Sequence, residues 1–548
     1  TVADDAQHTL PNFRQGDAIV LYERNADTDN VTNKMVFKGN IDYLNENEIC
    51  IRLRATQQNS SVLPSDSLYA IEHDAMDTTF RSMYQGLYAF MSATKERRDL
   101  LLSQREPRFD AALDKQIAEA ADDFTRIALK AKAAKDYFLL VGPPGTGKTS
   151  CALKKMVETF YKEEGAQILL LSYTNRAVDE ICKALSSIRP EVDFIRVGSE
   201  LSCDENYREH LIENELATCM RRTEVYERIN RCRILVGTVA SISGKPELFR
   251  LKHFDVAIVD EATQILEPQL LGILCAKGEN GKEGVGKFIL IGDHKQLPAV
   301  VLQNSEQSEV YDEALSAVGL KNLKDSLFER LYRTARQHTD AHRTYDMLCR
   351  QGRMHPEVAL FANQAFYEGR LLPVGLPHQL EDSGNINRLS FYPSQPEPMG
   401  SSAKTNHSEA KIAARLAATI YKEHSEAFDA SRTLGIITPY RSQIALIKKE
   451  IEALGIPELN QILIDTVERF QGSERDVIIY SFCVNYPYQL KFLSNLTEED
   501  GILIDRKLNV ALTRARKQML LTGVPALLER NPLYKSLLKL IESLRNIA

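Results

Sequence analysis

The fold is decided by one stretch of the chain, Tyr137-Phe138-Leu139-Leu140-Val141-Gly142-Pro143-Pro144-Gly145-Thr146-Gly147-Lys148-Thr149. Its apolar start predicts a buried strand, and the rest matches the pattern G-x-x-x-x-G-K-[ST] ahead of an expected helix at 150–161. In such a loop, backbone N–H groups close on phosphate oxygens, Lys148 adds positive charge and the Thr149 hydroxyl ligates Mg²⁺. The sequence therefore predicts a nucleoside triphosphate site. The residues expected to form it are Gly142, Pro143, Pro144, Gly145, Thr146, Gly147, Lys148, Thr149 and Ser150.

Partner carboxylates are expected at the end of a neighbouring strand, and residues 256–259 predict that strand. Asp260 and Glu261 follow it directly. We expect Asp260 to hold Mg²⁺ together with Thr149, and Glu261 to polarise the attacking water. The alternative is an ordinary acidic pair that caps a helix or lies in solvent.

Outward from this stretch, the chain alternates apolar strands with helical patterns, which is typical of doubly wound parallel sheets. The strands fall into two series, so we predict an α/β fold with two tandem domains and a boundary between Leu320 and Asp346. The first series is 137–141, 168–171, 194–197, 234–236, 256–259 and 288–291, and the second is 434–437, 462–464, 477–482 and 519–522. The stretch 373–406, rich in Pro, Gly, Ser and Asn, is expected to be a long connection.

The N-terminal region has a different pattern. Residues 12–82 read as short strands separated by turn signals, which predicts a small β-barrel at 1–82 or an unrelated small β-domain. Residues 83–121 read as a helical stalk. The chain starts with Thr, and its first residues show no pattern of a secretory signal, so we expect a piece of a longer protein with further domains, or a processed chain.

Composition excludes several classes of protein. Apolar residues make up 43% and charged residues 26% of 548 residues, which is typical of a globular chain, and no membrane-spanning run is expected. Residues 1–50 hold nine acidic and four basic residues, so most of the net charge of −7 belongs to them. The near-neutral remainder neither requires nor excludes nucleic acid. Nine scattered cysteines without a C-x-x-C pair favour a reducing, cytoplasmic location over disulfides or zinc.

Further motifs decide which kind of nucleotide-binding protein this chain resembles. They occur at 260–264 (D-E-A-T-Q), 292–299 (G-D-H-K-Q-L-P-A), 351–356 (Q-G-R-M-H-P), 466–476 (T-V-E-R-F-Q-G-S-E-R-D) and 508–516 (L-N-V-A-L-T-R-A-R). In identity and order they resemble the superfamily 1 helicases. The resemblance is to the 5′→3′ branch that includes the nonsense-mediated-decay RNA helicase and the immunoglobulin mu-binding helicase.

This resemblance implies two RecA-like motor domains, at 122–340 and 341–548, and ATP as the nucleotide. Arg353 and Arg514 of the second domain would reach the phosphate site as arginine fingers, Gln296 would sense the γ-phosphate and Glu474 would bond the ribose. In much of the family an aromatic residue stacks on the adenine where this chain has Gly352. The glutamine that reads the adenine edge has one candidate here, Gln116, 26 residues before Gly142.

The resemblance also implies contacts with single-stranded DNA or RNA. The expected residues are Thr174, Asn175, Thr238, Thr438, Tyr440 and Thr466. Hydroxyl groups, an amide and loop N–H groups would hold phosphates, which carry no sequence information, although each Thr could instead be an ordinary helix cap. We therefore predict an ATP-driven helicase, acting as a monomeric motor. The alternative is a nucleic-acid-stimulated ATPase switch in a larger assembly, whereas a protein-unfolding ring would not account for the motifs from 351 to 516.

Overall fold

A computed structural model describes residues 13, 16–45, 48–55, 59–74, 78–279, 281–301, 303, 305–337, 340–382, 386–398, 402–499 and 501–545. The chain divides into two compact units, Thr1–Arg81 and Ser82–Ala548. Within the described ranges no helix combines the length and the apolar character needed to cross a membrane.

The first unit contains one antiparallel sheet. Its strands are β1 (Ala18–Glu23), β2 (Val36–Leu44), β3 (Ile49–Leu53) and β4 (Tyr69–His73), in the order β3-β2-β1-β4. Ile19, Tyr22 and Ile41 are among its buried residues. The predicted strands are present. In the described residues β3 and β4 are the outer strands of this sheet, and the closed barrel that we expected stays a prediction.

Helices from Thr78 onward occupy the predicted stalk region. They are α1 (Thr78–Met91), α2 (Lys95–Leu101) and α3 (Asp114–Ala118). Phe90, Leu100 and Leu101 pack into the core of the α/β domain that follows. The expected helical segments are therefore packed on that domain.

The first α/β domain is built on a seven-stranded parallel sheet in the order β11-β5-β10-β9-β6-β8-β7. The strands are β5 (Tyr137–Val141), β6 (Ile168–Ser172), β7 (Phe194–Val197), β8 (Ile234–Thr238), β9 (Phe254–Val259), β10 (Val285–Gly292) and β11 (Tyr345–Met347). Leu139 faces one apolar core and Phe138 and Leu140 face the other. The sheet is therefore buried on both faces, which explains the continuous apolar runs in its sequence.

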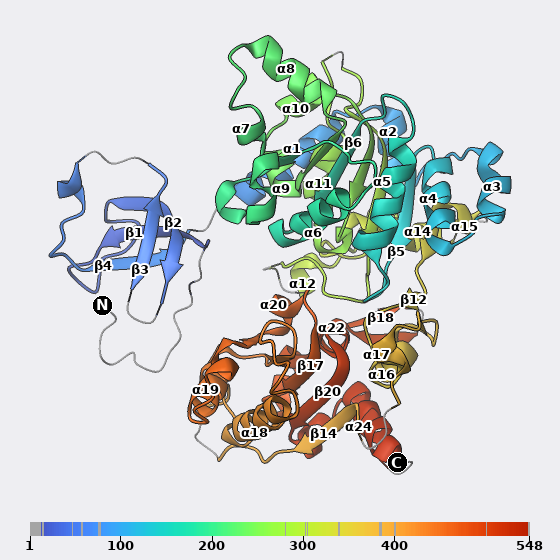
Figure 1. The fold of residues 1–548 in the computed structure, drawn as a ribbon. Helices are drawn as coiled ribbons and strands as arrows, with labels where there is room; N and C mark the ends of the chain where they lie inside the picture. The colour runs from blue at the N-terminus through green and yellow to red at the C-terminus, as the bar shows by residue number, and fades with distance from the viewer. Residues whose placement is uncertain are drawn as a thin grey trace. The chain divides into compact units, whose positions relative to one another are not determined.

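Helices cover both faces of this sheet (Figure 1). The helices of this domain are α4 (Asp123–Ala133), α5 (Lys154–Tyr161), α6 (Asn175–Ser186), α7 (Ile212–Glu215), α8 (Arg222–Arg231), α9 (Val239–Ser243), α10 (Glu247–Leu251), α11 (Glu267–Leu274), α12 (Ser305–Ser308), α13 (Glu313–Ala317), α14 (Leu327–Ala335) and α15 (Ala341–Thr344). Strand β11 belongs to this sheet because it pairs with β5. The first sheet therefore extends past the boundary that the sequence placed between residues 340 and 341.

The second α/β domain has a five-stranded parallel sheet in the order β14-β20-β17-β15-β16. Its strands are β14 (Leu389–Pro393), β15 (Leu434–Ile437), β16 (Leu463–Asp465), β17 (Arg475–Ser481) and β20 (Ala515–Gly523). All four predicted strands of the second series are confirmed. Strand β14 lies inside the stretch that we expected to be a connection, and it pairs with β20. The sequence did not predict it, because its Leu-Ser-Phe pattern is too short to indicate a strand without that neighbour.

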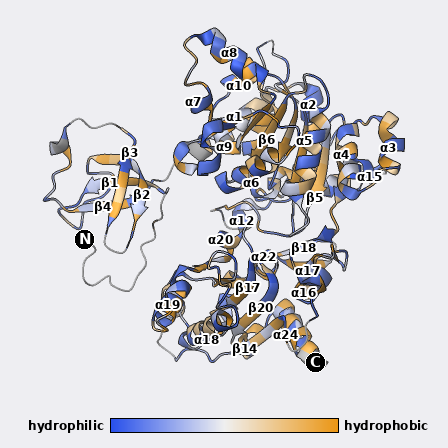
Figure 2. Ribbon diagram, viewed as in Figure 1, coloured by the Kyte–Doolittle hydropathy of each residue, from blue (hydrophilic) through white to orange (hydrophobic). Residues whose placement is uncertain are grey.

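The remaining elements surround this sheet. The helices are α16 (Pro356–Phe366), α17 (Pro377–Leu380), α18 (His407–Glu423), α19 (Arg441–Glu452), α20 (Val467–Phe470), α21 (Leu490–Leu493), α22 (Arg506–Leu512), α23 (Pro525–Leu528) and α24 (Pro532–Arg545). The short strand pairs are β12 (Arg350–Gln351) with β13 (Leu372–Pro373), and β18 (Leu496–Glu499) with β19 (Ile502–Asp505). Hydrophobic residues concentrate on the central strands of both sheets (Figure 2). The two parallel sheets confirm tandem RecA-like domains as the fold class.

Candidate functional site

The predicted phosphate loop joins the end of β5 to a helix that begins at Lys148 and continues into α5. Gly145 and Gly147 have φ of +73° and +77°, a left-handed conformation that glycine adopts without a steric penalty. The Thr146 hydroxyl donates to the carbonyl oxygen of Pro143 at 2.7 Å and closes the loop. A Cβ atom added at Gly142 would lie 2.1 Å from Cγ of Lys148, so the lysine side chain folds directly over this glycine. The backbone thus forms a cradle that fits phosphate groups.

Asp260 lies at the carboxyl end of β9 and is 1% exposed. It accepts hydrogen bonds from the Thr149 hydroxyl and, at 2.9 Å, from the backbone N–H of Glu261. Burial and the negative charge of Glu261 raise the pKa of Asp260, and Lys148 partly opposes them. A hydroxyl and a carboxylate oxygen side by side are the ligand types that Mg²⁺ prefers, so these two residues fit a magnesium site.

Glu261 has φ of +53°, an uncommon backbone conformation for a residue with a side chain. Its carboxylate lies 3.4 Å from the Lys148 ammonium, measured from Oε1 to Nζ, and Oε2 accepts a hydrogen bond of 3.1 Å from Gln264. Strained residues of this kind gather at functional sites, where surrounding contacts hold them. The strained backbone holds the carboxylate beside the lysine that is expected to bind the terminal phosphates.

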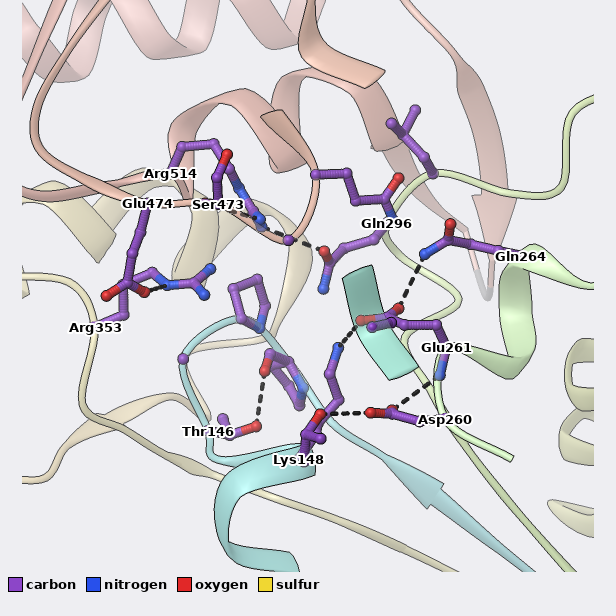
Figure 3. Close-up of a pocket in the computed structure, with 18 of the residues that line it drawn as sticks. Thr146, Lys148, Asp260, Glu261, Gln264, Gln296, Arg353, Ser473, Glu474 and Arg514 are labelled. Atoms are coloured by element: carbon purple, nitrogen blue, oxygen red, sulfur yellow. Dashed lines mark hydrogen bonds and ion pairs between the residues drawn. The ribbon is translucent and has the colours of Figure 1, made fainter. Parts of the chain in front are cut away.

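Arg514 follows α22 in the second α/β domain and is 2% exposed. Its Nη2 lies 3.4 Å from Oε1 of Gln296, which belongs to the first domain, and its Nε donates to the carbonyl oxygen of Val510 at 2.9 Å. Burial and the nearby Arg353 lower the pKa of Arg514, but a guanidinium keeps its charge at neutral pH. Figure 3 shows that Arg514 and Gln296 point toward each other above the phosphate loop.

Arg353 contacts the phosphate loop directly. A Cβ atom added at Gly145 would lie 2.4 Å from Cβ of Arg353, and the N–H of Gly352 donates to the carbonyl oxygen of Gly145 at 2.9 Å. Arg353 Nε also donates to Glu474 at 2.6 Å. Burial raises the pKa of Glu474, but Arg353 and Arg516 outweigh it, so the pKa is lowered. Glu474, predicted to bond a ribose, is therefore paired with an arginine finger candidate in this structure.

These residues line one cleft of about 1800 Å³ in the second unit. The cleft brings together Pro143, Pro144, Gly145, Thr146, Gly147, Lys148, Thr149, Ser150, Asp260, Glu261, Gln296, Arg353, Glu474 and Arg514. Gln116, the candidate for reading the adenine edge, is exposed on α3 and does not line the cleft. Phe124 lines it instead, beside Gly147.

A buried hydrogen-bond network behind the cleft was not predicted. Asp293 accepts from Gln296 at 2.8 Å and from the Tyr367 hydroxyl at 2.7 Å, and Asn509 donates to Tyr367 at 2.8 Å. It therefore joins Gln296 to α22, the helix that precedes Arg514. Asp293 and Asn509 lie inside recognised motifs, which could have suggested them, but Tyr367 has no local signal because its partners are distant in sequence.

The predicted strand contacts lie at the carboxyl ends of parallel strands in both sheets. Thr174 and Thr238 cap α6 and α9: their hydroxyl oxygens accept from Ala177 N at 3.2 Å and from Ser241 N at 3.0 Å. Both threonines are thus helix caps, the alternative left open by the sequence, and such caps place free N–H groups beside them. Asn175 begins α6, and Thr174 also lines the cleft.

The second sheet supplies the other three strand candidates. Tyr440 and Thr466 precede α19 and α20, and the Tyr440 hydroxyl accepts from Gln489 at 3.2 Å. Thr438 is fully buried, and its hydroxyl has no hydrogen-bond partner among the described residues. In each sheet the candidate residues therefore lie at the carboxyl ends of the β-strands. Their role in binding single-stranded nucleic acid stays a prediction.

Comparisons with known proteins find proteins that are named as helicases. Two family models, each described as an AAA domain, match residues 119–228 with 215–304, and 323–526. The chain is 27% identical to the DNA replication ATP-dependent helicase/nuclease DNA2 of Bos taurus, over 97% of this chain and 50% of that protein. It is 28% identical to the Homo sapiens protein of the same name, over 88% of this chain and 46% of that protein.

A shorter yeast relative also matches. The DNA polymerase alpha-associated DNA helicase A of Saccharomyces cerevisiae is 25% identical, over 75% of this chain and 65% of that protein. The solved structure of an arterivirus nonstructural protein 10 helicase with DNA matches with a TM-score of 0.35 and 16% identity, over 73% of this chain and 62% of that chain. The chain spans about half the length of the DNA2 relatives. The narrower resemblance to the nonsense-mediated-decay helicase stays a prediction.

Proposed function

Since the chain belongs to the superfamily 1 helicases, we propose that it hydrolyses ATP to move along single-stranded nucleic acid and to separate duplexes. One observation carries the proposal. Arg353 and Arg514 come from the second RecA-like domain and meet the phosphate loop and Gln296 of the first. Hydrolysis would then require both domains in contact, which couples the state of the nucleotide to domain motion.

The cleft residues divide the chemistry among them. Backbone N–H groups of the loop and Lys148 would hold the β- and γ-phosphates. Thr149 and Asp260 would hold Mg²⁺, which when bound neutralises charge on the phosphates. Glu261 would orient the attacking water and accept its proton, while the two arginines offset the charge that develops on the γ-phosphoryl group.

The track would be held by the carboxyl-end loops of both sheets. Helix α6 begins in such a loop of the first sheet, and helix α19 begins in such a loop of the second sheet. The partial positive charge of a helix N-terminus favours a phosphate there. Such contacts read no sequence, which suits a motor that must pass any base. We propose DNA as the first track to test, because the names of the DNA2 and yeast relatives refer to DNA. We also propose 5′→3′ movement and a monomeric motor, which the resemblance of the motifs implies.

The test is steady-state phosphate release from Mg·ATP with single-stranded DNA, single-stranded RNA or neither, followed by unwinding of a duplex with one 5′ tail. Strong stimulation by one strand type together with unwinding supports the motor and identifies its track. Stimulation without unwinding would favour the ATPase switch. Lys148→Ala is the control for contaminating ATPases, because it removes the charge that positions the phosphates.

A further inference from the structure

An aromatic segment with two exposed rings lies on the second RecA-like domain, between β17 and β18. It consists of Tyr486, Tyr488 and Phe492, on a short 3-10 turn and α21. Tyr488 is 55% and Phe492 64% exposed. The Tyr486 ring stacks on Tyr488, with centroids 5.8 Å apart and planes 12° apart.

A buried amide holds this aromatic segment in place. Gln489 is 2% exposed, and its Oε1 accepts from the backbone N–H groups of Asn485 and Tyr486, both at 2.9 Å. Its Nε2 donates to the carbonyl oxygen of Ala403 at 2.7 Å and to the Tyr440 hydroxyl at 3.2 Å. The exposed rings thus stand on a base fixed by four hydrogen bonds, so little ordering is needed when they bind a ligand.

The aromatic segment adjoins one of the predicted strand contacts, because Gln489 bonds Tyr440. The Lys507 ammonium donates to the carbonyl oxygen of Phe492 at 3.3 Å and lies 3.1 Å from Glu468, two residues after Thr466. Exposed Lys491, next to Phe492, adds positive charge to the same segment.

We propose that the aromatic segment stacks on the bases of single-stranded nucleic acid whose phosphates are held by the neighbouring loops. The inference rests on the proposed function and adds to it a contact with bases. A flat ring accepts every base, so stacking adds affinity without sequence preference. Exposed rings beside a lysine and next to a candidate phosphate contact match a nucleic-acid strand better than the continuous apolar patch that a protein partner needs.

The experiment compares two fluorescein-labelled probes by anisotropy at moderate salt: a thymidine oligonucleotide of about 20 residues and an abasic strand of the same length. We expect the wild-type protein to bind the base-bearing strand more tightly. The double variant Tyr488→Ala, Phe492→Ala should bind that strand about 10-fold or more weakly, with little change for the abasic strand.

Two further variants separate stacking from damage to the fold. Tyr488→Phe with Phe492→Trp keeps flat rings and should retain wild-type affinity. Tyr311→Ala removes an exposed tyrosine outside the aromatic segment, whose hydroxyl donates to Glu309. This variant should bind both probes as the wild-type protein does.

The outcomes are distinguishable. Equal wild-type affinity for both probes, or an equal loss for both in the double variant, overturns base stacking but leaves strand-stimulated hydrolysis, and hence the motor, in place. The same holds if the double variant binds both probes as wild type does. If the wild-type protein binds neither probe, the proposed function and this inference fail together.

Discussion

At the scale of single residues, the buried arginine of the second domain is the sharpest test of the cleft. Arg514→Ala should lower kcat for ATP by about 10³-fold or more, because the charge of the γ-phosphoryl group then lacks a partner. The KM for ATP should change little. Arg415→Ala, on the exposed face of α18, is the matched control. A change confined to KM would mean that Arg514 only binds nucleotide.

Asp260 predicts a pH dependence of stability. Its pKa is raised in the folded protein, mainly by burial, so between about pH 4 and neutrality the folded state holds more protons at this site than the unfolded state. This carboxylate therefore destabilises the fold progressively as the pH rises. Asp260→Asn, in EDTA, should gain Tm relative to wild type from pH 5 to pH 7.5, and lose hydrolysis. An equal difference in Tm between the variant and the wild type at pH 5 and at pH 7.5 would contradict the raised pKa of Asp260.

At the scale of secondary-structure elements, the start of α6 has two roles that substitution can separate. Thr174→Ala removes the helix cap and should cost about 1 kcal/mol of stability. Thr174→Asp keeps a good cap but places a negative charge where phosphate is expected. We therefore expect the Asp variant to melt like wild type yet bind single-stranded DNA at least 10-fold more weakly, by thermal melting and anisotropy. Unchanged affinity in both variants would leave Thr174 as a cap alone.

At the scale of the whole molecule, contacts across the cleft hold the two RecA-like domains together. Arg506 lies 2.5 Å from Glu329, and Glu499, on the β18–β19 hairpin, lies 2.9 Å from His294 and 3.2 Å from Arg336. Burial raises the pKa of Glu499, but His294 and the nearby cations outweigh it and bring the pKa to about 2. The carboxylate is therefore charged at neutral pH, and the hairpin joins the second domain to the loop that carries Gln296.

The Tyr367 hydroxyl is the centre of the buried network between the domains, which predicts a coupling defect. Tyr367→Phe keeps the ring but removes one hydrogen bond from Asp293 and one from Asn509, at about 0.5–1.5 kcal/mol each. Asp293 keeps its bond from Gln296, and Asn509 keeps its bond to the carbonyl oxygen of Lys295. Strand-stimulated kcat should fall about 10-fold, with nucleotide affinity retained. Tyr534→Phe, which removes a buried hydroxyl bonded to Asp505 away from the cleft, is the control. Equal losses in the two variants would point to stability and not to coupling.

The sequence by itself determined the phosphate loop, the carboxylates after β9 and nearly all strands of the two sheets. These features depend on short windows: a strand buried on both faces is a continuous apolar run, and a phosphate loop needs its glycines and lysine at fixed spacing. The order of the motifs also indicated the superfamily 1 helicases, because each step of phosphate binding and hydrolysis requires a particular residue type.

Only the tertiary structure decided what meets across the cleft. It brought Arg353 against Gly145, joined Gln296 to Asn509 through Tyr367, placed β11 in the first sheet and left Gln116 outside the cleft. Each of these depends on the packing of residues far apart in the chain. No local pattern records which loop lies against which, because that is set by the strand order of two sheets and by the surfaces that they bury against each other.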